Sequence, residues 1–395
     1  MRIKGVLSGL FLALAAAATG VSLAQDTSPQ QQAPSGAQAK VLARALIEDA
    51  LKASRAAEIF DGMRRTLREV YIPSLREMVQ GDYPGVPEMD AAGAAALAKI
   101  LTLMDYVRQA GDQLDVALSE NRDAMISDVA GQMAKSAGAL DINDARRLLD
   151  LPAVRKTLDA FYATSKLVTG FSYEDSRTFS EFSAWANTLA IDINQLIPGR
   201  QGGSTGIPSR DKVVKAQALV EDILQISHLD EIVGEARRFA REVYAETAPM
   251  PDDERQQLLG RIDQFEFTYN MQRAVVIAAA PSLVAAALKS EQLEALHGYV
   301  RSPAFVKLFD LLRDAVKSAT ACTKDDILEA RKAFKHFGKT MKLNERSAEE
   351  QERAKQEWQA LADKWAKILQ ERISPETRRG LDQAFEELNP GGPPL

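Results

Sequence analysis

The sequence predicts an all-α protein made of two tandem helical-bundle domains related by internal duplication, followed by a C-terminal helical extension. Apolar residues recur at steps of three and four along the 395-residue chain, as on the buried face of a helix, and no run shows the alternation of a β-strand. Residues 45–71 align with residues 218–244, and fourteen of the 27 aligned positions are identical. Chance would give about two identities, so we interpret the two segments as copies of one unit.

The repeat resumes further along the chain at a different spacing. Asp112 aligns with Asp263 and Pro152 with Pro303, an offset of 151 residues in place of the 173 residues that separate the first segments. The first copy therefore has 22 extra residues. We place them around residues 82–98, a stretch that contains the turn-rich sequence DYPGVPEMD.

The two aligned segments carry the same apolar stripe. In the first copy it runs from Leu46 through Phe60 and Met63 to Val70, and the equivalent positions of the second copy are also apolar. We expect each segment to form a helix that buries this stripe.

Helix starts are marked at several places in the second half. Ser302 and Ser374 each precede a proline, which combines a capping hydroxyl with a residue preset for the first helical position. Thr323 and Ser347 each stand three residues before an acidic side chain and resemble capping boxes.

The first residues have the pattern of a removable signal peptide. Arg2 and Lys4 precede an apolar run, and small residues at Ser22 and Ala24 form a cleavage site. An uncleaved anchor is the alternative, but the apolar run is too short to span a bilayer. The sequence therefore predicts a periplasmic or secreted protein without a transmembrane segment in the mature chain.

Composition and patterning divide the chain into seven segments, with Gln-, Ser-, Pro- and Gly-rich stretches as leader and linker. The expected segments are a signal peptide at 1–24, a disordered leader at 25–39, the first helical domain at 40–196, a linker at 197–210, the second helical domain at 211–343, C-terminal helices at 344–389 and a tail at 390–395.

The balance of charge and the single cysteine exclude some roles. The formal net charge is −6, and removal of Arg2 and Lys4 with the signal peptide makes it −8. An acidic, mixed surface argues against nucleic acid and anionic membranes as partners. Cys322 is the only cysteine, so no intramolecular disulfide can form, and we expect it to be a small semi-buried residue.

No motif in the chain predicts catalysis, a cofactor or a metal. The three histidines, His228, His297 and His336, lack further ligands at metal-binding spacing. No nucleophile elbow or phosphate loop is present. We therefore list no catalytic, cofactor-binding or metal-binding residue, and the sequence favours a non-enzymatic role.

One set of polar residues lies within or beside apolar stripes in both copies. Arg122 and Arg273 interrupt the stripe of the long middle helix. The acidic residues beside the first stripe are Asp49 and Asp222, so we predict the buried pairs Asp49–Arg122 and Asp222–Arg273. Arg64 and Arg237 flank the first stripe and complete this candidate network. The alternative is that the inward arginines bind an anion or a partner.

A helix after residue 347 has no counterpart in the first copy. Its apolar face is a candidate partner-binding face, and the alternative is that it docks onto the second copy as core. The face consists of Trp358, Leu361, Trp365 and Ile368.

Residues 293–307, LEALHGYVRSPAFVK, resemble the signature of a family of exported bacterial proteins that share a helical domain of unknown function. The signature is aromatic-Tyr-x-Ser-Pro-x-Gly-x-Lys, and four residues meet it: Tyr299, Ser302, Pro303 and Lys307. Val300 and Phe305 replace the family's tyrosine and glycine, and the first copy, with the sequence LLDLP at 148–152, is further off. The resemblance implies an exported helical bundle and supplies no catalytic residue.

These features lead to a first hypothesis of a non-enzymatic exported helical protein that binds a protein partner or an apolar ligand in the cell envelope. A second hypothesis is an envelope hydrolase that uses carboxylates on facing helices. A third is a purely architectural repeat. The sequence identifies neither the partner, the pathway nor the oligomeric state.

We predict that the signal is removed after Ala24, because the small residues end there. The intact mass of the exported protein should correspond to a chain that begins at Gln25. A mature form that still begins at Met1 would contradict the predicted localisation.

Overall fold

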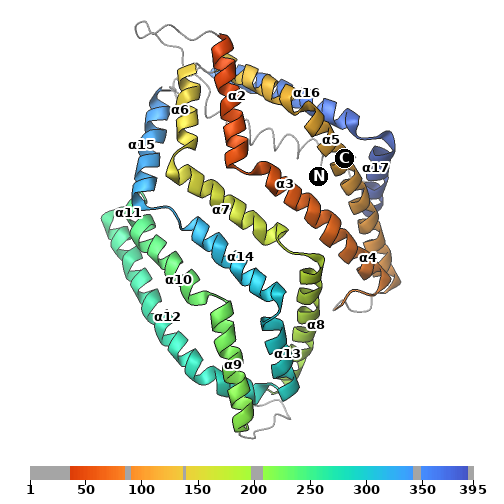
Figure 1. Cartoon of the computed structure of the whole chain (residues 1–395), viewed down its shortest axis with the longest axis vertical. Coiled ribbons are helices and arrows are strands. Elements are labelled where there is room, and N and C mark those ends of the chain that lie inside the picture. Colours follow the sequence, from red (N-terminus) through yellow and green to blue (C-terminus); the bar gives the residue numbers. More distant parts are fainter. Residues whose placement is uncertain (1–35, 85–89, 137–138, 197–207, 341–347, 390–395) are drawn as a thin grey trace. The chain divides into compact units, whose positions relative to one another are not determined.

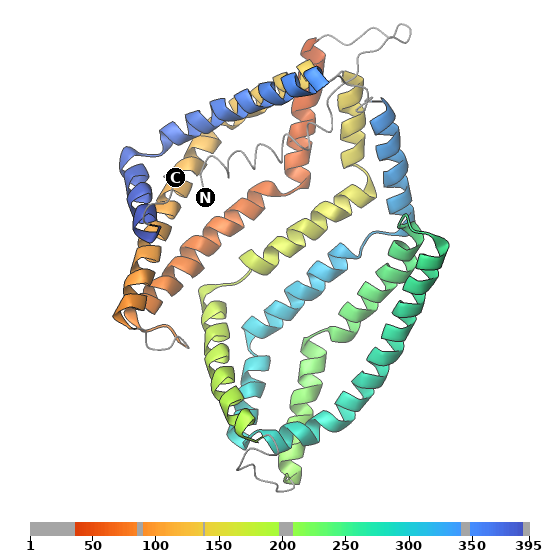
Figure 2. The same ribbon diagram turned by 180° about the vertical axis from the view of Figure 1, so that it is seen from behind.

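The computed structural model describes residues 36–84, 90–136, 139–196, 208–340 and 348–389. The predicted signal peptide, the start of the predicted leader, most of the predicted linker and the predicted tail lie outside the described residues. The described residues form helices joined by short turns and contain no β-strand, in agreement with the predicted all-α class (Figures 1 and 2).

The first half of the chain forms one series of helices. In order, they are α2 (Gly36–Ala53), α3 (Ala56–Thr66), the π-helical turn η1 (Leu67–Tyr71), α4 (Ile72–Gln80), α5 (Ala91–Ser136), α6 (Ala139–Leu149), α7 (Pro152–Thr169) and α8 (Tyr173–Leu196).

The second half repeats this order and then adds two helices. The series is α9 (Arg210–Ile226), α10 (Leu229–Arg238), the π-helical turn η2 (Phe239–Tyr244), α11 (Ala245–Thr247), α12 (Asp252–Ala287), α13 (Ser290–Val300), α14 (Pro303–Ala319), α15 (Lys324–Thr340), α16 (Ala348–Arg372) and α17 (Pro375–Leu388). The halves differ most where α4 has nine residues and α11 three, and where α5 has 46 residues and α12 has 36. This is the region where the sequence alignment places the extra residues.

The aligned segments at the start of each half, residues 45–71 and 218–244, do not form one helix each. Each contains two helices separated by a residue with a left-handed backbone conformation. Arg55 has φ 50° and His228 has φ 48°, and among the described residues these are the two non-glycine positions with positive φ. The single continuous stripe expected from the sequence is therefore interrupted after the break, although Val70 at its end is buried as expected. Phe60 and Met63 are 44% and 50% exposed, whereas Ile59 is buried. The left-handed residue changes the rotation of the following helix, so a different set of residues faces inward.

The chain divides into two compact units that are each discontinuous in sequence. The first unit contains α2, most of α3 and α5, α6, the start of α7, most of α15, α16 and α17. The second contains η1, α4, the start of α5, most of α7, α8 to α14 and the start of α15. Helix α8 of the first half thus belongs to the second unit, and most of α15 belongs to the first.

In the first unit, α2 packs against α6 (Figure 1). Ala43 and Ile142 are completely buried there, together with residues of α5. Phe337 of α15 and Trp358 of α16 complete this core. Alanines let the helix axes approach closely, and each large apolar side chain that is buried contributes about 1.5–3 kcal/mol.

In the second unit, α9 packs along α12 and against α13 (Figure 2). Its core contains Ala216 and Leu219 of α9, Ala285 of α12 and Leu293 of α13. Leu189 of α8 packs against this core from the first half of the chain. Each unit therefore contains helices from both halves of the chain.

The break at His228 gives a test that isolates backbone conformation. His228→Gly and His228→Ala both remove the imidazole, but only glycine adopts a left-handed conformation without steric cost, so the glycine variant should be more stable by about 1 kcal/mol. The measurement is the free energy of unfolding in urea. Gln217, which is exposed on α9, is the matched control: there the alanine variant should be more stable than the glycine variant. Equal stability of the two His228 variants would contradict the left-handed break.

Candidate functional site

The two buried ion pairs expected from the sequence do not form. Arg122 is exposed, and Asp49 instead accepts a hydrogen bond of 2.7 Å from Nε of Arg146. Arg273 is paired with Asp230, at 2.6 Å from its Nε. An arginine at the edge of an apolar stripe can carry its charge out to water on a long stem, and spacing alone does not distinguish it from a buried one.

The two predicted acids nevertheless occupy the same place in their halves. Asp49 of α2 pairs with Arg146 of α6, and Asp222 of α9 pairs with His297 of α13. Arg146 and His297 are themselves aligned in sequence at the 151-residue offset. Hydrogen bonds from Arg301 and then from His297 lower the pKa of Asp222, whose side chain is 18% exposed. Each acid therefore ties the first helix of its half to the helix after the long one.

Arg64 and Arg237 also bind equivalent acids. Arg64 of α3 pairs with Asp115 of α5, and Arg237 of α10 pairs with Glu266 of α12. Asp115 and Glu266 stand at the 151-residue offset. Sequence reasoning did not select either acid, although both lie in the aligned segments DQLD and DQFE that marked the repeat.

Asp230 organises a polar group on α10 and α12. It accepts hydrogen bonds from Nε of Arg273 at 2.6 Å and from the hydroxyl of Tyr269 at 2.8 Å. The hydrogen bond from Arg273 is the main cause of the lowered pKa of Asp230. Acids held ionised in this way, such as Asp222 and Asp230, are unsuited to act as the general acid of a hydrolase, which needs a raised pKa.

The residues that carry the family resemblance have a structural role in the second unit. Ser302 caps α14 and accepts a hydrogen bond from the backbone N–H of Phe305, with Pro303 at the first turn. Nζ of Lys307 lies 2.7 Å from Asp175 of α8, whose side chain is only 11% exposed. The predicted cap at Ser302 is therefore confirmed.

Asp175 is held on several sides. It accepts a hydrogen bond of 2.8 Å from the backbone N–H of Ser172, and its own N–H donates to the Ser172 hydroxyl. Burial pushes the pKa of Asp175 up, but the hydrogen bonds from Lys307 and Ser172 outweigh it and leave the pKa lowered. Thr323 and Asp326 form the same reciprocal cap at the start of α15, as predicted.

An aromatic cluster surrounds the same junction of α8 with α13 and α14. Phe182 lies at the centre, with ring centroids 4.8 Å from Phe305 and 5.4 Å from Tyr299. Phe179 and Trp185 extend the cluster along α8. Phe305, which replaces the family's glycine, fills this cluster, so its side chain has a packing role.

The candidate partner face of α16 is not free. Trp358 and Trp365 are 5% and 3% exposed, and Leu361 and Ile368 are partly buried. The face packs on Met125 and Val129 of α5, so it is docked core on the first half and not on the second. A docked stripe and a free one have the same spacing, which is why the sequence left both open.

Polar contacts along the edges of α16 and α17 fix how these helices lie on α5. Lys364 is 2.6 Å from Asp128, and Arg372 is 3.6 Å from Glu120. Gly380 of α17 faces the ring of Tyr106, where any Cβ would overlap the ring.

Histidines, the cysteine and acidic residues could together hold a metal ion. Among the described residues, no group of three or more of these side chains is placed to do so. His228 pairs with Asp310 at 3.1 Å, His336 is exposed, and Cys322 is buried and is not part of a disulfide. Of the helices in the described ranges, none combines the length and apolarity needed to cross a membrane.

Large apolar side chains are exposed on α3, α5 and α12. Phe60 and Met63 of α3 and Val116 of α5 are 44%, 50% and 57% exposed. They neighbour in sequence the paired residues Arg64 and Asp115. Helix α12 exposes the largest set: Phe265, Phe267, Met271, Val275, Val276 and Leu283. We take the exposed apolar residues of these three helices as the candidate functional site, because large apolar side chains exposed in number on a surface are typical of interaction sites.

The pair Asp175–Lys307 predicts how stability depends on pH. Because the pKa of Asp175 is lowered in the folded state, its contribution is present above its unfolded pKa of about 4 and is lost as the pH falls through the folded value. Asp175→Asn keeps a capping side chain but removes the charge, and we expect a loss of about 1–3 kcal/mol at pH 7 that shrinks in acid. Urea unfolding from pH 7 to pH 3 measures it, with exposed Asp382→Asn as the control. A constant difference across this range would contradict the pairing.

Comparisons with known proteins give no match: no family model, no curated protein and no solved structure matches the chain. Its function is therefore inferred from the contacts and surfaces described above.

Proposed function

We propose that this chain is a non-enzymatic, exported helical protein that binds a protein partner in the cell envelope through exposed apolar helix faces. The observation that carries the proposal is the exposure of Phe60, Met63 and Val116 beside the Arg64–Asp115 pair. An ion pair fixes α3 against α5 while the apolar residues next to it stay in water. Large apolar side chains that are exposed on helices joined by an ion pair are typical of a surface that another molecule covers.

The proposed localisation depends on the N-terminal sequence. Arg2, Lys4, the apolar run and the small residues before Gln25 are the features of an exported chain. Ser302, Pro303 and Lys307 support membership in the exported helical family that the sequence resembles.

We further propose that the two halves are diverged copies of one ancestral helical unit. The helices follow in the same order, and the two left-handed residues, Arg55 and His228, stand at the offset of the aligned segments. Both halves have a π-helical turn after the second helix, and Arg64 and Arg237 bind acids at equivalent positions. Duplication supplies two related binding faces, and divergence lets each take a different occupant.

A photo-activated cross-linking residue tests the proposed binding face in the exported protein. Placed at Met63, it should give a discrete adduct with an envelope protein, because that side chain is half exposed on an apolar face. Arg147, whose side chain is 82% exposed on α6, is the control position and should give no such adduct. The adduct should disappear when Phe60→Ser and Val116→Ser are added. Identical adducts at both positions, or none at Met63, would contradict the proposal.

A further inference from the structure

The junction of α4 with the start of α8 contains three buried polar atoms that have no hydrogen-bond partner among the described residues. They are Oγ of Ser74, Oε2 of Glu77 and the hydroxyl oxygen of Tyr173. Ser74 is 6% exposed, and Glu77 follows it by three residues, so the two lie on the same face of α4. Because buried polar atoms are almost always paired, these three point to a group that the chain itself does not supply.

Tyr173 lies beside Glu77 without neutralising it. Burial raises the pKa of Tyr173 most, the neighbouring carboxylate of Glu77 raises it further, and the pKa reaches about 12. Arg177 also acts on Tyr173 through its charge, but it donates no hydrogen bond to the buried oxygen of Glu77. The hydroxyls of Tyr83 and Ser176, 2.9 Å apart, join the same two segments. The junction therefore places one carboxylate among hydroxyl groups, and a buried charge is costly unless it is paired.

In the second half, a lysine occupies the position of Tyr173. Lys324 and Tyr173 stand at the 151-residue offset, and each is the first residue of its helix, directly after the side chain that caps it. Nζ of Lys324 lies 2.9 Å from Glu246 of α11, which follows η2 as α4 follows η1. At this junction of the second half, an ammonium group thus pairs with the carboxylate.

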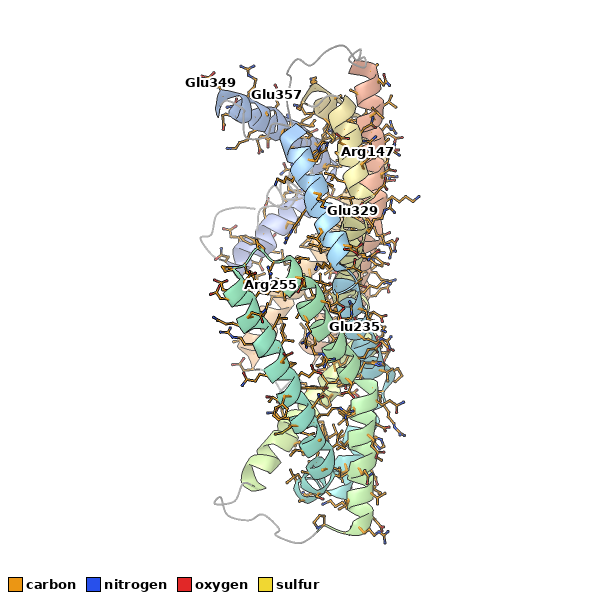
Figure 3. The ribbon with its side chains drawn as sticks, turned by 90° about the vertical axis from the view of Figure 1, so that its left-hand side faces the viewer. Arg147, Glu235, Arg255, Glu329, Glu349 and Glu357 are labelled. Atoms are coloured by element: carbon orange, nitrogen blue, oxygen red, sulfur yellow. The ribbon has the colours of Figure 1, made fainter. Side chains whose placement is uncertain are left out.

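The junction of the second half has a further positive charge. Nε of Arg255, which Figure 3 labels at the first turn of α12, donates a hydrogen bond of 2.9 Å to the backbone carbonyl of Ala245 in α11. The hydrogen bond and charge of Lys324, followed by the charge of Arg255, lower the pKa of Glu246. The buried oxygen of Glu77 has no such donor among the described residues. The comparison of the two halves therefore identifies a cation as the group that Glu77 requires.

The three atoms match the chemistry of an ammonium group. Such a group carries one positive charge and at least three N–H donors, and it has no acceptor. The junction offers one carboxylate and three oxygen atoms that can accept a hydrogen bond. We propose that the junction of α4 and α8 binds an ammonium group, from a free ammonium ion or from the end of a primary amine, between Ser74, Glu77 and Tyr173. This goes beyond the proposed function and does not rest on it, since it concerns none of the exposed apolar faces.

Thermal unfolding of the full mature chain at constant ionic strength tests the site. Ammonium chloride should raise the unfolding temperature above its value in sodium chloride, by about 2 °C at ten times the dissociation constant. Tetramethylammonium chloride has the same charge but no N–H donor and should match sodium chloride. A rise with ammonium alone identifies the free ion as the ligand, and a rise with methylammonium as well identifies a site that admits primary amines. Equal temperatures in all these salts, or an equal rise with potassium chloride, would overturn the proposal.

Substitutions at the junction separate binding from a general salt effect. Glu77→Gln removes the charge and keeps the shape, so it should abolish the rise with ammonium while the helical circular dichroism is unchanged. Tyr173→Lys copies the second half and should also abolish the rise, because the new lysine supplies the ammonium group itself. Glu174→Gln, exposed on α8, is the matched control and should keep the rise. A rise that persists in both Glu77→Gln and Tyr173→Lys would overturn the proposal.

Discussion

The left-handed residue in each half sets the orientation of the helix that follows it. Arg55 and His228 end one helix and start the next without a glycine. The turn rotates the second helix, so that Ile59 faces inward and Met63 faces water. It also brings Arg64 to Asp115 and Arg237 to Glu266. The exposure of Phe60 and Met63 on α3 thus follows from a backbone conformation that costs energy in an arginine. The packing of α2 on α6 supports this conformation.

Ion pairs and apolar cores have different roles in these units. Most of the pairs between helices are substantially exposed, and such pairs contribute at most about 1 kcal/mol each. The cores of small and aliphatic residues around Ala43 and Leu219 supply more of the stability. The pairs instead select among helix rotations, because an arginine and an acid meet in only one of them. The Asp175–Lys307 and Asp222–His297 pairs are the more buried exceptions; the first joins α8 to α14 and the second joins α9 to α13.

The sequence predicts the helical class and several caps correctly, because caps depend on one or two neighbouring residues such as Ser302. It also selects Asp49 and Asp222 as important acids, but not their partners. A partner depends on which helix packs against the first one, and the spacing of residues along a single helix does not show that α2 packs on α6 and α9 on α13. The left-handed breaks were missed as well, because neither Arg55 nor His228 is the glycine that usually marks such a turn. The Trp358 face was ambiguous for a different reason. Its spacing is the same whether the helix is docked or free, and only the position of α5 resolves this.

Both compact units contain helices from both halves of the chain, and this affects how the chain folds during synthesis. The first compact unit includes residues from the N-terminal helices and from α15, α16 and α17. A ribosome releases the N-terminal helices long before those C-terminal ones, so the first unit cannot close while synthesis continues. Until Phe337 and Trp358 are synthesised, α2 and α6 expose part of the apolar surface that these residues cover in the folded unit. Such a chain exposes apolar surface to proteases and to aggregation until its C-terminus is complete, and a carrier that shields α2 and α6 would protect it during that time.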